Sequence, residues 1–311
     1  PQFPWTGLLF GGSIVGIWYW CTAQYIVQRT LAAKNIKIAR RGAIFGAYLK
    51  LTPIFIFLIP GIIAYALKQK GLLHYEKSDQ VFPTLVTYLL PTGLKGLVAG
   101  GLMAALMSSL ASVFNSASTL FTVDIFKKLY PNSPESKLVR IGKIATGFIV
   151  VLGMLWIPIM EKIGGGVLYQ YLQNVQSYIA PPITAVFVLG ILWKRINAQG
   201  AIATLFYGLL SGTIRIILEL MKDDLTGAAE WYATVNFSHF AIFNFLVCVL
   251  VCCVVSLLTA KPSEAQIQGL TLGTLTPEQR KANRESYSAI DVVISVILAA
   301  VVFGILVYFR G

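Results

Sequence analysis

Aromatic and amide side chains crowd the end of a long apolar run, in the stretch GIWYWCTAQYIVQR at residues 16–29. Tyr19 and Trp20 are adjacent, so on a helix they project about 100° apart, and Gln24 follows Trp20 by four residues on the same face. Ring faces beside hydrogen-bonding groups suit a sugar, whose C–H faces stack on rings while its hydroxyl groups need partners. The alternative is an aromatic belt at a membrane interface, although belts rarely combine with two glutamines and a threonine.

A lysine, Lys50, stands in the apolar stretch GAYLKLTPIF, nine residues after the basic cluster that ends at Arg41. At 1.5 Å per residue, its backbone lies about 13 Å inward from that cluster. Snorkelling relieves a lysine at that depth only in part. We therefore expect Lys50 to face a wet cavity, with a snorkelled lysine as the alternative, and we expect Pro53 and Pro60 to kink the same helix.

Three glutamines recur every third residue in the stretch YQYLQNVQSYIAPP, which puts Gln170, Gln173 and Gln176 on one side of a helix. Glycines at 164–166 precede them and a proline pair at 181–182 follows. A helix interrupted in this way frees backbone groups, which is tolerated where they line a cavity. A purely structural kink is the alternative.

A stripe of small polar residues follows one helix face in the stretch AALMSSLASVFNSAST. Its members recur at spacings of three and four, and they are Ala105, Ser108, Ser109, Ser112, Ser116 and Thr119. Close packing of helices through small residues explains part of such a stripe. Hydroxyl and carbonyl oxygens are also the ligands that a hard cation such as Na⁺ prefers, so the stripe is a candidate sodium site as well.

The elements that must position these residues are membrane helices. The chain is 56% hydrophobic and 12% charged, with a mean hydropathy of +0.72, whereas soluble domains average about 25% charged residues. Stretches long enough to cross a bilayer of about 30 Å are predicted at 5–26, 43–67, 94–126, 141–160, 166–193, 201–221, 238–259 and 289–309. Helices satisfy their own backbone groups in lipid, so we predict an all-α integral membrane protein with about eight spans.

The net charge of +12 follows the predicted topology. With alternating spans, sixteen lysines and arginines fall in the loops after the first, third, fifth and seventh spans, and six fall on the other side. This is the positive-inside pattern, so it predicts those four loops in the cytoplasm and both ends of the chain outside the cell. The basic surplus is thus a signal of topology and does not indicate nucleic-acid binding.

Catalytic side chains are not predicted. The sequence shows no metal-ligand spacing, phosphate loop or nucleophile–base arrangement, and we expect neither an enzyme nor a resident cofactor. Arg215 and Glu219 are four residues apart and are expected to neutralise each other as a structural pair. The four cysteines fall inside predicted spans and are expected to act as small apolar packing residues.

Three segments carry a resemblance to a known family. They are WYWCTAQYIVQRTLAAKN, FPTLVTYLLPTGLKGLVAGGLMAALMSSLASVFNSASTLFTVDIFKK and YLQNVQSYIAPPITAVFVLGILWKR. Together they resemble the sodium/glucose cotransporter branch of the solute:sodium symporter family. The match runs in order from about Trp5 to Glu219 and is specific, and beyond Glu219 it thins to a similar layout.

The resemblance implies a transporter fold of two inverted five-helix repeats with extra flanking helices, working by alternating access. On that fold the chain would begin at the first helix of the second repeat. Residues 1–199 would form that repeat and residues 200–311 three C-terminal flanking helices. The N-terminal half of the transporter, which supplies the other half of both the sugar site and the sodium site, would be absent from these residues.

Residue roles follow from the resemblance as expectations. Tyr19 would close the sugar site on the cytoplasmic side with Trp20 beside it, and Lys50 and Gln173 would hydrogen-bond sugar hydroxyls, with Gln24 as a further contact. Sodium ligands would be the Ala105 carbonyl and the hydroxyls of Ser108 and Ser109.

The implied activity is uptake of a glucose-like or galactose-like hexose into the cell together with Na⁺, as a coupled co-substrate, across the plasma membrane. Relatives often carry polar residues where this chain has Gly16 and Ala23, which leaves another polyol such as myo-inositol as an alternative substrate. A membrane sugar sensor without flux is the second alternative, and an inactive helical fragment is the third.

Overall fold

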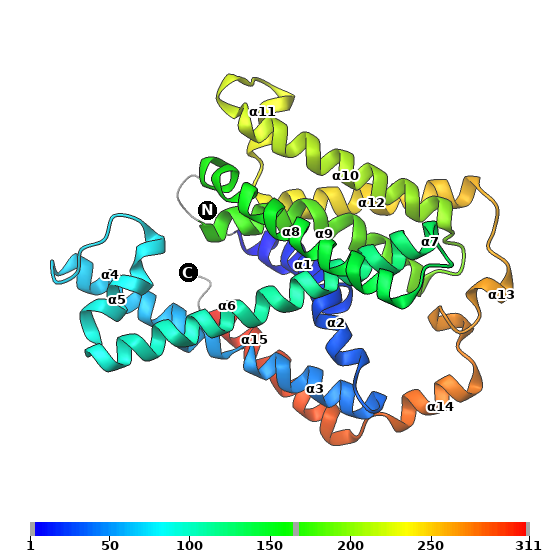
Figure 1. Cartoon of the computed structure of the whole chain (residues 1–311), viewed down its shortest axis with the longest axis horizontal. Coiled ribbons are helices and arrows are strands. Elements are labelled where there is room, and N and C mark those ends of the chain that lie inside the picture. Colours follow the sequence, from blue (N-terminus) through cyan, green and yellow to red (C-terminus); the bar gives the residue numbers. More distant parts are fainter. Residues whose placement is uncertain (1–3, 164–167, 309–311) are drawn as a thin grey trace. The chain divides into compact units, whose positions relative to one another are not determined.

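A computed structural model describes residues 4–163 and 168–308 (Figure 1). Within these ranges every regular element is helical, which confirms the predicted all-α fold class. The elements are η1 (Gly7–Gly11), α1 (Gly12–Cys21), α2 (Gln24–Leu31), α3 (Ile36–Leu49), η2 (Ile54–Leu58), α4 (Ile59–Gln69), η3 (Ser78–Gln80), α5 (Val81–Leu89), α6 (Thr92–Leu120), η4 (Phe121–Phe126), α7 (Lys127–Leu129), α8 (Glu135–Ile163), α9 (Leu168–Leu192), α10 (Ala198–Leu220), η5 (Lys222–Asp224), α11 (Ala228–Thr234), α12 (Phe237–Leu258), α13 (Glu264–Ile267), η6 (Leu272–Thr274), α14 (Pro277–Glu285) and α15 (Ala289–Tyr308).

Seven helices in the described ranges are long and apolar enough to cross a membrane. They are Ile36–Gln69, Thr92–Leu129, Glu135–Pro158, Leu168–Leu192, Ala198–Leu220, Phe237–Leu258 and Ala289–Tyr308. Each coincides with one of the predicted spans from the second to the eighth. The first predicted span, 5–26, is represented by the shorter apolar helix Gly7–Cys21, because the chain leaves the helix at Thr22.

The chain forms two compact units, Pro1–Lys50 with Leu172–Gly311, and Leu51–Tyr171. The grouping reflects which helices pack together. It does not test the predicted division at residue 199 into a repeat and flanking helices, which stays a prediction.

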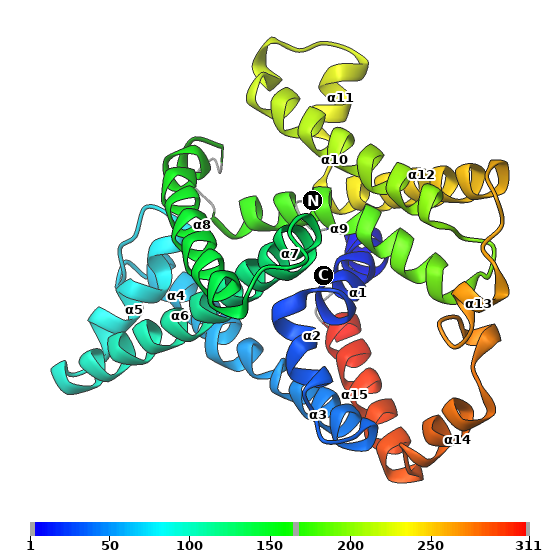
Figure 2. The ribbon, with the colours of Figure 1, turned by 45° about the vertical axis from the view of Figure 1, so that its right-hand side comes forward.

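The first unit is centred on the helix pair α10 and α12, which lie side by side in both ribbon views (Figures 1 and 2). Five of the seven buried residues of α12 recur at every fourth position, namely Phe240, Asn244, Cys248, Cys252 and Ser256, and the other two are Ser238 and Ala241. Residues at the start of α10 contact the end of α12, as Gly200 meets Ser256. Near the end of α10, Arg215 lies over the ring of Phe240 at the start of α12, so the two helices are antiparallel. Their close approach depends on small residues, as is common between membrane helices.

Helix α9 packs on α10 through a second set of glycines. Gly208 lies against the Pro182 ring, and a Cβ atom added at Gly212 would lie 3.3 Å from Cβ of Tyr178. The proline pair at 181–182 does not interrupt α9, which runs unbroken from Leu168 to Leu192. The interruption expected after the glutamines is therefore absent from α9, and the glycines expected to interrupt it beforehand, 164–166, lie outside the described residues.

The expected pairing of Arg215 with Glu219 is wrong. The Glu219 carboxylate accepts hydrogen bonds from the Tyr178 hydroxyl at 2.7 Å and from Nδ2 of Asn174 at 3.2 Å, both on α9. Arg215 donates instead to the carbonyl of Val235, at the end of α11. Partners on neighbouring helices have replaced the partner four residues along the same helix.

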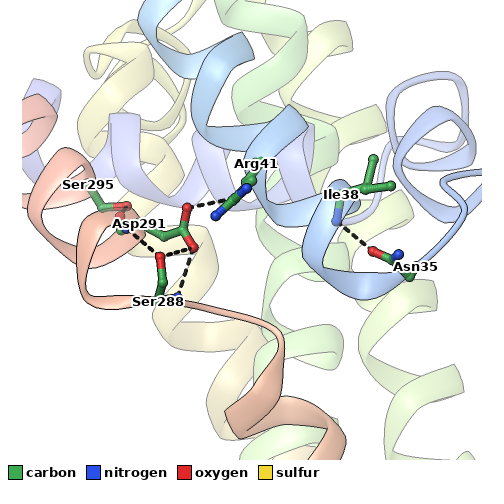
Figure 3. Close-up of polar contacts among 6 residues, drawn as sticks. All are labelled: Asn35, Ile38, Arg41, Ser288, Asp291 and Ser295. Atoms are coloured by element: carbon green, nitrogen blue, oxygen red, sulfur yellow. Dashed lines mark hydrogen bonds and ion pairs between the residues drawn. The ribbon is translucent and has the colours of Figure 1, made fainter.

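Helices α3 and α15 form a second contact within this unit, which Figure 3 enlarges. Arg41 Nε lies 3.0 Å from Oδ1 of Asp291, in the first turn of α15. The other carboxylate oxygen accepts 2.8 Å bonds from the backbone N–H and the hydroxyl of Ser288, so one carboxylate both caps α15 and ties it to α3. Asn35 caps the start of α3 by accepting the N–H of Ile38 at 2.9 Å (Figure 3).

The second unit contains α4 to α8. Ala64, Leu73 and Leu85 form a small apolar core between α4, α5 and the loop that joins them. Helices α6 and α8 meet through small residues, where the Ser118 hydroxyl donates to the Gly142 carbonyl at 2.7 Å. A Cβ at Gly142 would lie 3.3 Å from that hydroxyl oxygen, a tight contact, so the glycine allows the close approach of the two helices.

Candidate functional site

The aromatic residues of the opening stretch form an edge-to-face cluster at the end of α1. The ring centroids of Tyr19 and Trp20 are 5.7 Å apart at an interplanar angle of 87°, and those of Tyr19 and Tyr25 are 6.1 Å apart at 79°. Such arrangements are the preferred ones for aromatic pairs. Trp20 is 41% exposed, so its ring is available to a ligand or to lipid.

A break in the helix directly after this cluster changes the expected geometry. The Trp18 carbonyl accepts bonds from the N–H groups of Thr22 and Ala23 at 3.0 and 3.1 Å and from the Thr22 hydroxyl at 2.6 Å. Ala23 is extended, and α2 begins at Gln24. The expectation that Trp20 and Gln24 share one helix face is therefore wrong, because the i,i+4 rule holds only within a continuous helix.

Lys50 joins the cluster from another helix. Its Nζ atom lies 5.1 Å from the Tyr19 ring centroid, within the range of a cation–π contact worth about 0.5–1 kcal/mol at an exposed site. Lys50 caps the end of α3, and a turn at Lys50 and Leu51 separates α3 from the helix that follows. The side chain is exposed and belongs to a helix end, whereas the sequence predicted the interior of a span.

Gln173 lies half-buried on α9, next to Asn174, which bonds Glu219 of α10. Helix α9 contacts α1 nearer its C-terminal end than Gln173, where the Thr184 hydroxyl donates to the Ile14 carbonyl at 3.0 Å. Eleven residues separate Gln173 from Thr184, or about 16 Å along a helix. This contact does not bring Gln173 to the Tyr19 cluster, and its place at a shared sugar site stays a prediction.

The expected sodium ligands Ala105, Ser108 and Ser109 lie on consecutive turns of α6 in the second unit, and all three are exposed. Further along, the hydroxyls of the stripe bond the carbonyls four residues earlier. These bonds are Ser112 to Ser108 at 3.0 Å, Ser116 to Ser112 at 2.8 Å and Thr119 to Asn115 at 2.8 Å. Helix packing through small hydroxyls occurs at Ser118, which bonds a carbonyl of α8, and Ser116 of the expected stripe is buried too.

The structure therefore brings together Tyr19, Trp20 and Lys50, as a shelf of rings with an ammonium group beside them, in which Trp20 and Lys50 are exposed and Tyr19 is half-buried. Tyr25 joins the shelf and was not predicted, because six residues from Tyr19 is not a same-face spacing on a continuous helix. Only the break at Thr22 gives it this position. Groups of three or more His, Cys, Asp or Glu side chains that could hold a metal are absent from the described residues.

Known proteins resemble this chain over most of its length. The model of a protein family described as "Sodium:solute symporter family" matches residues 2–208 of this chain. Sodium/myo-inositol cotransporter 2 of Bos taurus is 40% identical over 288 residues, which cover 87% of this chain and 43% of that protein. The sodium/mannose cotransporter of Bos taurus is 41% identical, with 89% of this chain and 49% of that protein covered.

A third relative is sodium/glucose cotransporter 4 of Danio rerio, which is 37% identical over 304 residues, covering 91% of this chain and 46% of that protein. The chain thus spans less than half the length of each of these relatives. The three printed names share sodium coupling and differ in the sugar or polyol.

Proposed function

The chain belongs to the sodium:solute symporter family, and from that premise we propose that it takes part in sodium-coupled uptake of a sugar or a related polyol across the plasma membrane. The relatives are named as cotransporters, and seven apolar helices in the described residues suit a multi-pass membrane protein. We propose no enzyme activity. The positive-inside count supports an orientation with both ends of the chain outside the cell.

The observation that carries the proposal is the shelf of Tyr19, Trp20 and Lys50. A sugar ring would stack on the exposed Trp20 face while the ammonium group, 5.1 Å from the Tyr19 centroid, donates to its hydroxyls. An ammonium group offers three donors and no acceptor, so it recognises the hydroxyl oxygens of the substrate. Gln24 and Gln173 are the proposed amide partners.

Sodium would be held by oxygen atoms, since a hard cation prefers uncharged or carboxylate oxygen ligands. We propose the Ala105 carbonyl and the Ser108 and Ser109 hydroxyls as its ligands on α6. Three ligands from one helix do not complete the shell of such an ion. The remaining ligands, and the remaining sugar contacts, would come from the part of the transporter that relatives carry in addition.

A second candidate substrate, a polyol such as myo-inositol, is favoured by Gly16. A Cβ atom placed there would meet nothing within 4 Å, so the position one turn before Tyr19 leaves open space beside the shelf. Buried Ala23 offers no side-chain polar group next to Gln24. A wider and less polar pocket would tolerate a substrate with a different arrangement of hydroxyls.

Uptake into proteoliposomes under an inward Na⁺ gradient tests the proposal, with labelled glucose and labelled myo-inositol in parallel. The chain is assayed alone and together with the N-terminal part of the bovine myo-inositol cotransporter. We expect uptake only from the combination. Lys50→Ala should reduce it at least about tenfold, equivalent to about 1.4 kcal/mol. Lys37→Ala, on the same helix and also exposed, is the matched control.

Each result of this assay has a definite meaning. Uptake that ignores the Na⁺ gradient would refute sodium coupling. Equal loss of uptake in Lys50→Ala and Lys37→Ala would refute the shelf as the sugar site. Sugar binding without flux in the combined protein would favour the sensor. The ratio of glucose uptake to myo-inositol uptake decides between the two substrates.

A further inference from the structure

A buried guanidinium group in the first unit has two nitrogens without a hydrogen-bond partner among the described residues. Arg215 is 2% exposed, and its Nη2 donates to the Val235 carbonyl at 2.7 Å. Its Nε and Nη1 are buried and have no hydrogen-bond partner among the described residues. The Cζ atom lies 4.8 Å from the Phe240 ring centroid, 5.8 Å from that of Tyr178 and 6.0 Å from that of Tyr232.

A second buried donor without a partner lies one helical turn away. Asn244 is fully buried, and its Oδ1 accepts from the Ser211 hydroxyl at 3.3 Å. Its Nδ2 has no partner among the described residues. Because α10 and α12 are antiparallel, the Ser211–Asn244 contact and the Arg215–Phe240 contact are neighbouring rungs, about one 5.4 Å turn apart.

A hydroxyl pair lies next to Asn244 and Arg215. Ser211 Oγ and the Tyr232 hydroxyl are 2.8 Å apart, and Tyr232 also donates to the Ser211 carbonyl at 3.2 Å. Ser211 lies four residues before Arg215 on α10 and is 5% exposed. We call Ser211, Arg215, Tyr232 and Asn244 the Arg215 cluster.

The charge of the cluster indicates what would fill it. A buried charge with neither an ion-pair partner nor full hydrogen bonding costs several kcal/mol or more. The nearest carboxylate on the same helix face, Glu219, bonds Tyr178 and Asn174, and among the described residues no carboxylate lies within 4.0 Å of Arg215. The three nitrogens of the cluster that lack a partner, Arg215 Nε and Nη1 and Asn244 Nδ2, are N–H donors, which bind an anion and repel a cation.

We propose that the Arg215 cluster binds a small monovalent anion, with chloride as the probe. Arg215 Nε and Nη1 supply the charge and two donors, and Asn244 Nδ2 supplies a third. The Ser211 proton goes to Asn244 Oδ1 and the Tyr232 proton to the Ser211 carbonyl, so the three nitrogens are the groups that would donate to the anion. Ser211, Arg215 and Asn244 are each exposed by 5% or less and Tyr232 is half-buried, which favours a monatomic ion over a phosphate or a carboxylate. The site is separate from the proposed sugar and sodium residues.

Thermal unfolding of the full chain in lipid nanodiscs tests the site, at constant Na⁺ with chloride or gluconate as the counter-ion. An anion that binds only the folded chain shifts the folding equilibrium about 100-fold when its concentration is 100 times the dissociation constant. We expect a higher midpoint in chloride than in gluconate. Asn244→Leu, which removes one donor at similar volume, and Arg215→Gln should each abolish that difference.

A matched control is Thr204→Val, on the same helix, where a fully buried hydroxyl bonds the Gly200 carbonyl at 2.8 Å and faces no donor without a partner. It should keep the full chloride effect. Equal midpoints of the wild-type chain in the two salts would overturn the proposal, as would an equal chloride effect in all variants. Diffraction from crystals grown in bromide should show an anomalous peak between Arg215 and Asn244, and a water molecule there would refute anion binding. If Arg215→Gln fails to fold, Asn244→Leu and the bromide peak still decide the question.

Discussion

Replacing Gly208 by alanine should destabilise the first unit, because the glycine sits against a rigid ring. A Cβ atom at Gly208 would overlap Cβ and Cγ of Pro182 and lie 3.4 Å from its Cδ. A proline ring cannot rotate away as a flexible side chain can, so α9 and α10 would have to separate. Overpacking of this kind costs about 1–3 kcal/mol.

The matched control is Gly190→Ala, which lies on α9, where a new Cβ would meet nothing within 4 Å. The gain in helix propensity from glycine to alanine, at most about 1 kcal/mol, applies to both variants and cancels in the comparison. The expected difference in unfolding free energy between the two variants is therefore the overpacking cost alone, about 1–3 kcal/mol.

Reversible unfolding in bicelles, followed by steric trapping or by titration with a denaturing detergent, measures this difference. If Gly208→Ala is within about 0.5 kcal/mol of Gly190→Ala, the reasoning is refuted, since surface substitutions alone vary by that much. Such a result would mean that α9 and α10 are further apart than the contact between Pro182 and Gly208 requires.

Two further predictions concern helix ends. Asn197→Ala should lower the unfolding free energy by about 0.5–2 kcal/mol, measured in the same assay, because Asn197 accepts the Gly200 N–H at 2.9 Å and donates to Thr259 at 2.7 Å; an unchanged value would show that this cap carries no stability. A double-mutant cycle of Arg41→Ala and Asp291→Asn should give a favourable coupling, because the two side chains form a 3.0 Å ion pair. Strictly additive effects would show that the pair contributes nothing to the contact between α3 and α15.

The sequence predicted the membrane helices well because each one is a continuous apolar run. A run of about twenty such residues has only one stable arrangement in lipid, so length and hydropathy decide it without knowledge of neighbours. The exception is the first predicted span. At the break the Thr22 hydroxyl bonds the Trp18 carbonyl at 2.6 Å, but Thr204 makes the same kind of bond inside the continuous helix α10, so a threonine in an apolar stretch does not signal a break.

Polar pairs were harder to predict because spacing along a helix does not fix the partner. Arg215 and Glu219 have the spacing of an ion pair, yet each found its partners on another helix. The contact of Lys50 with Tyr19 joins residues on α3 and α1, and no local pattern predicts it. The individual residues could be identified as candidates from their type alone, whereas their pairing required the packing.

Exposure separates two kinds of polar residue in these apolar helices. Arg215, Asn244 and Ser211 are buried between helices of one unit, where their bonds join the helices and leave three nitrogens without a partner among the described residues. The residues proposed for transport are different. Trp20, Gln24 and Lys50 are exposed, as are the hydroxyl-bearing residues Ser108 and Ser109 of α6.

Exposed polar groups on an apolar helix are costly in lipid, so they need either water or a protein surface that completes them. The relatives are about twice as long as this chain. Their additional residues are candidate surfaces to cover the proposed sugar residues and the proposed sodium residues. Burial of Ser108 and Ser109 by the added N-terminal part, measured as loss of thiol labelling in Ser108→Cys and Ser109→Cys, would be expected if that surface completes the sodium site. Labelling that is unchanged on assembly would place the sodium site elsewhere, whatever the uptake assay shows.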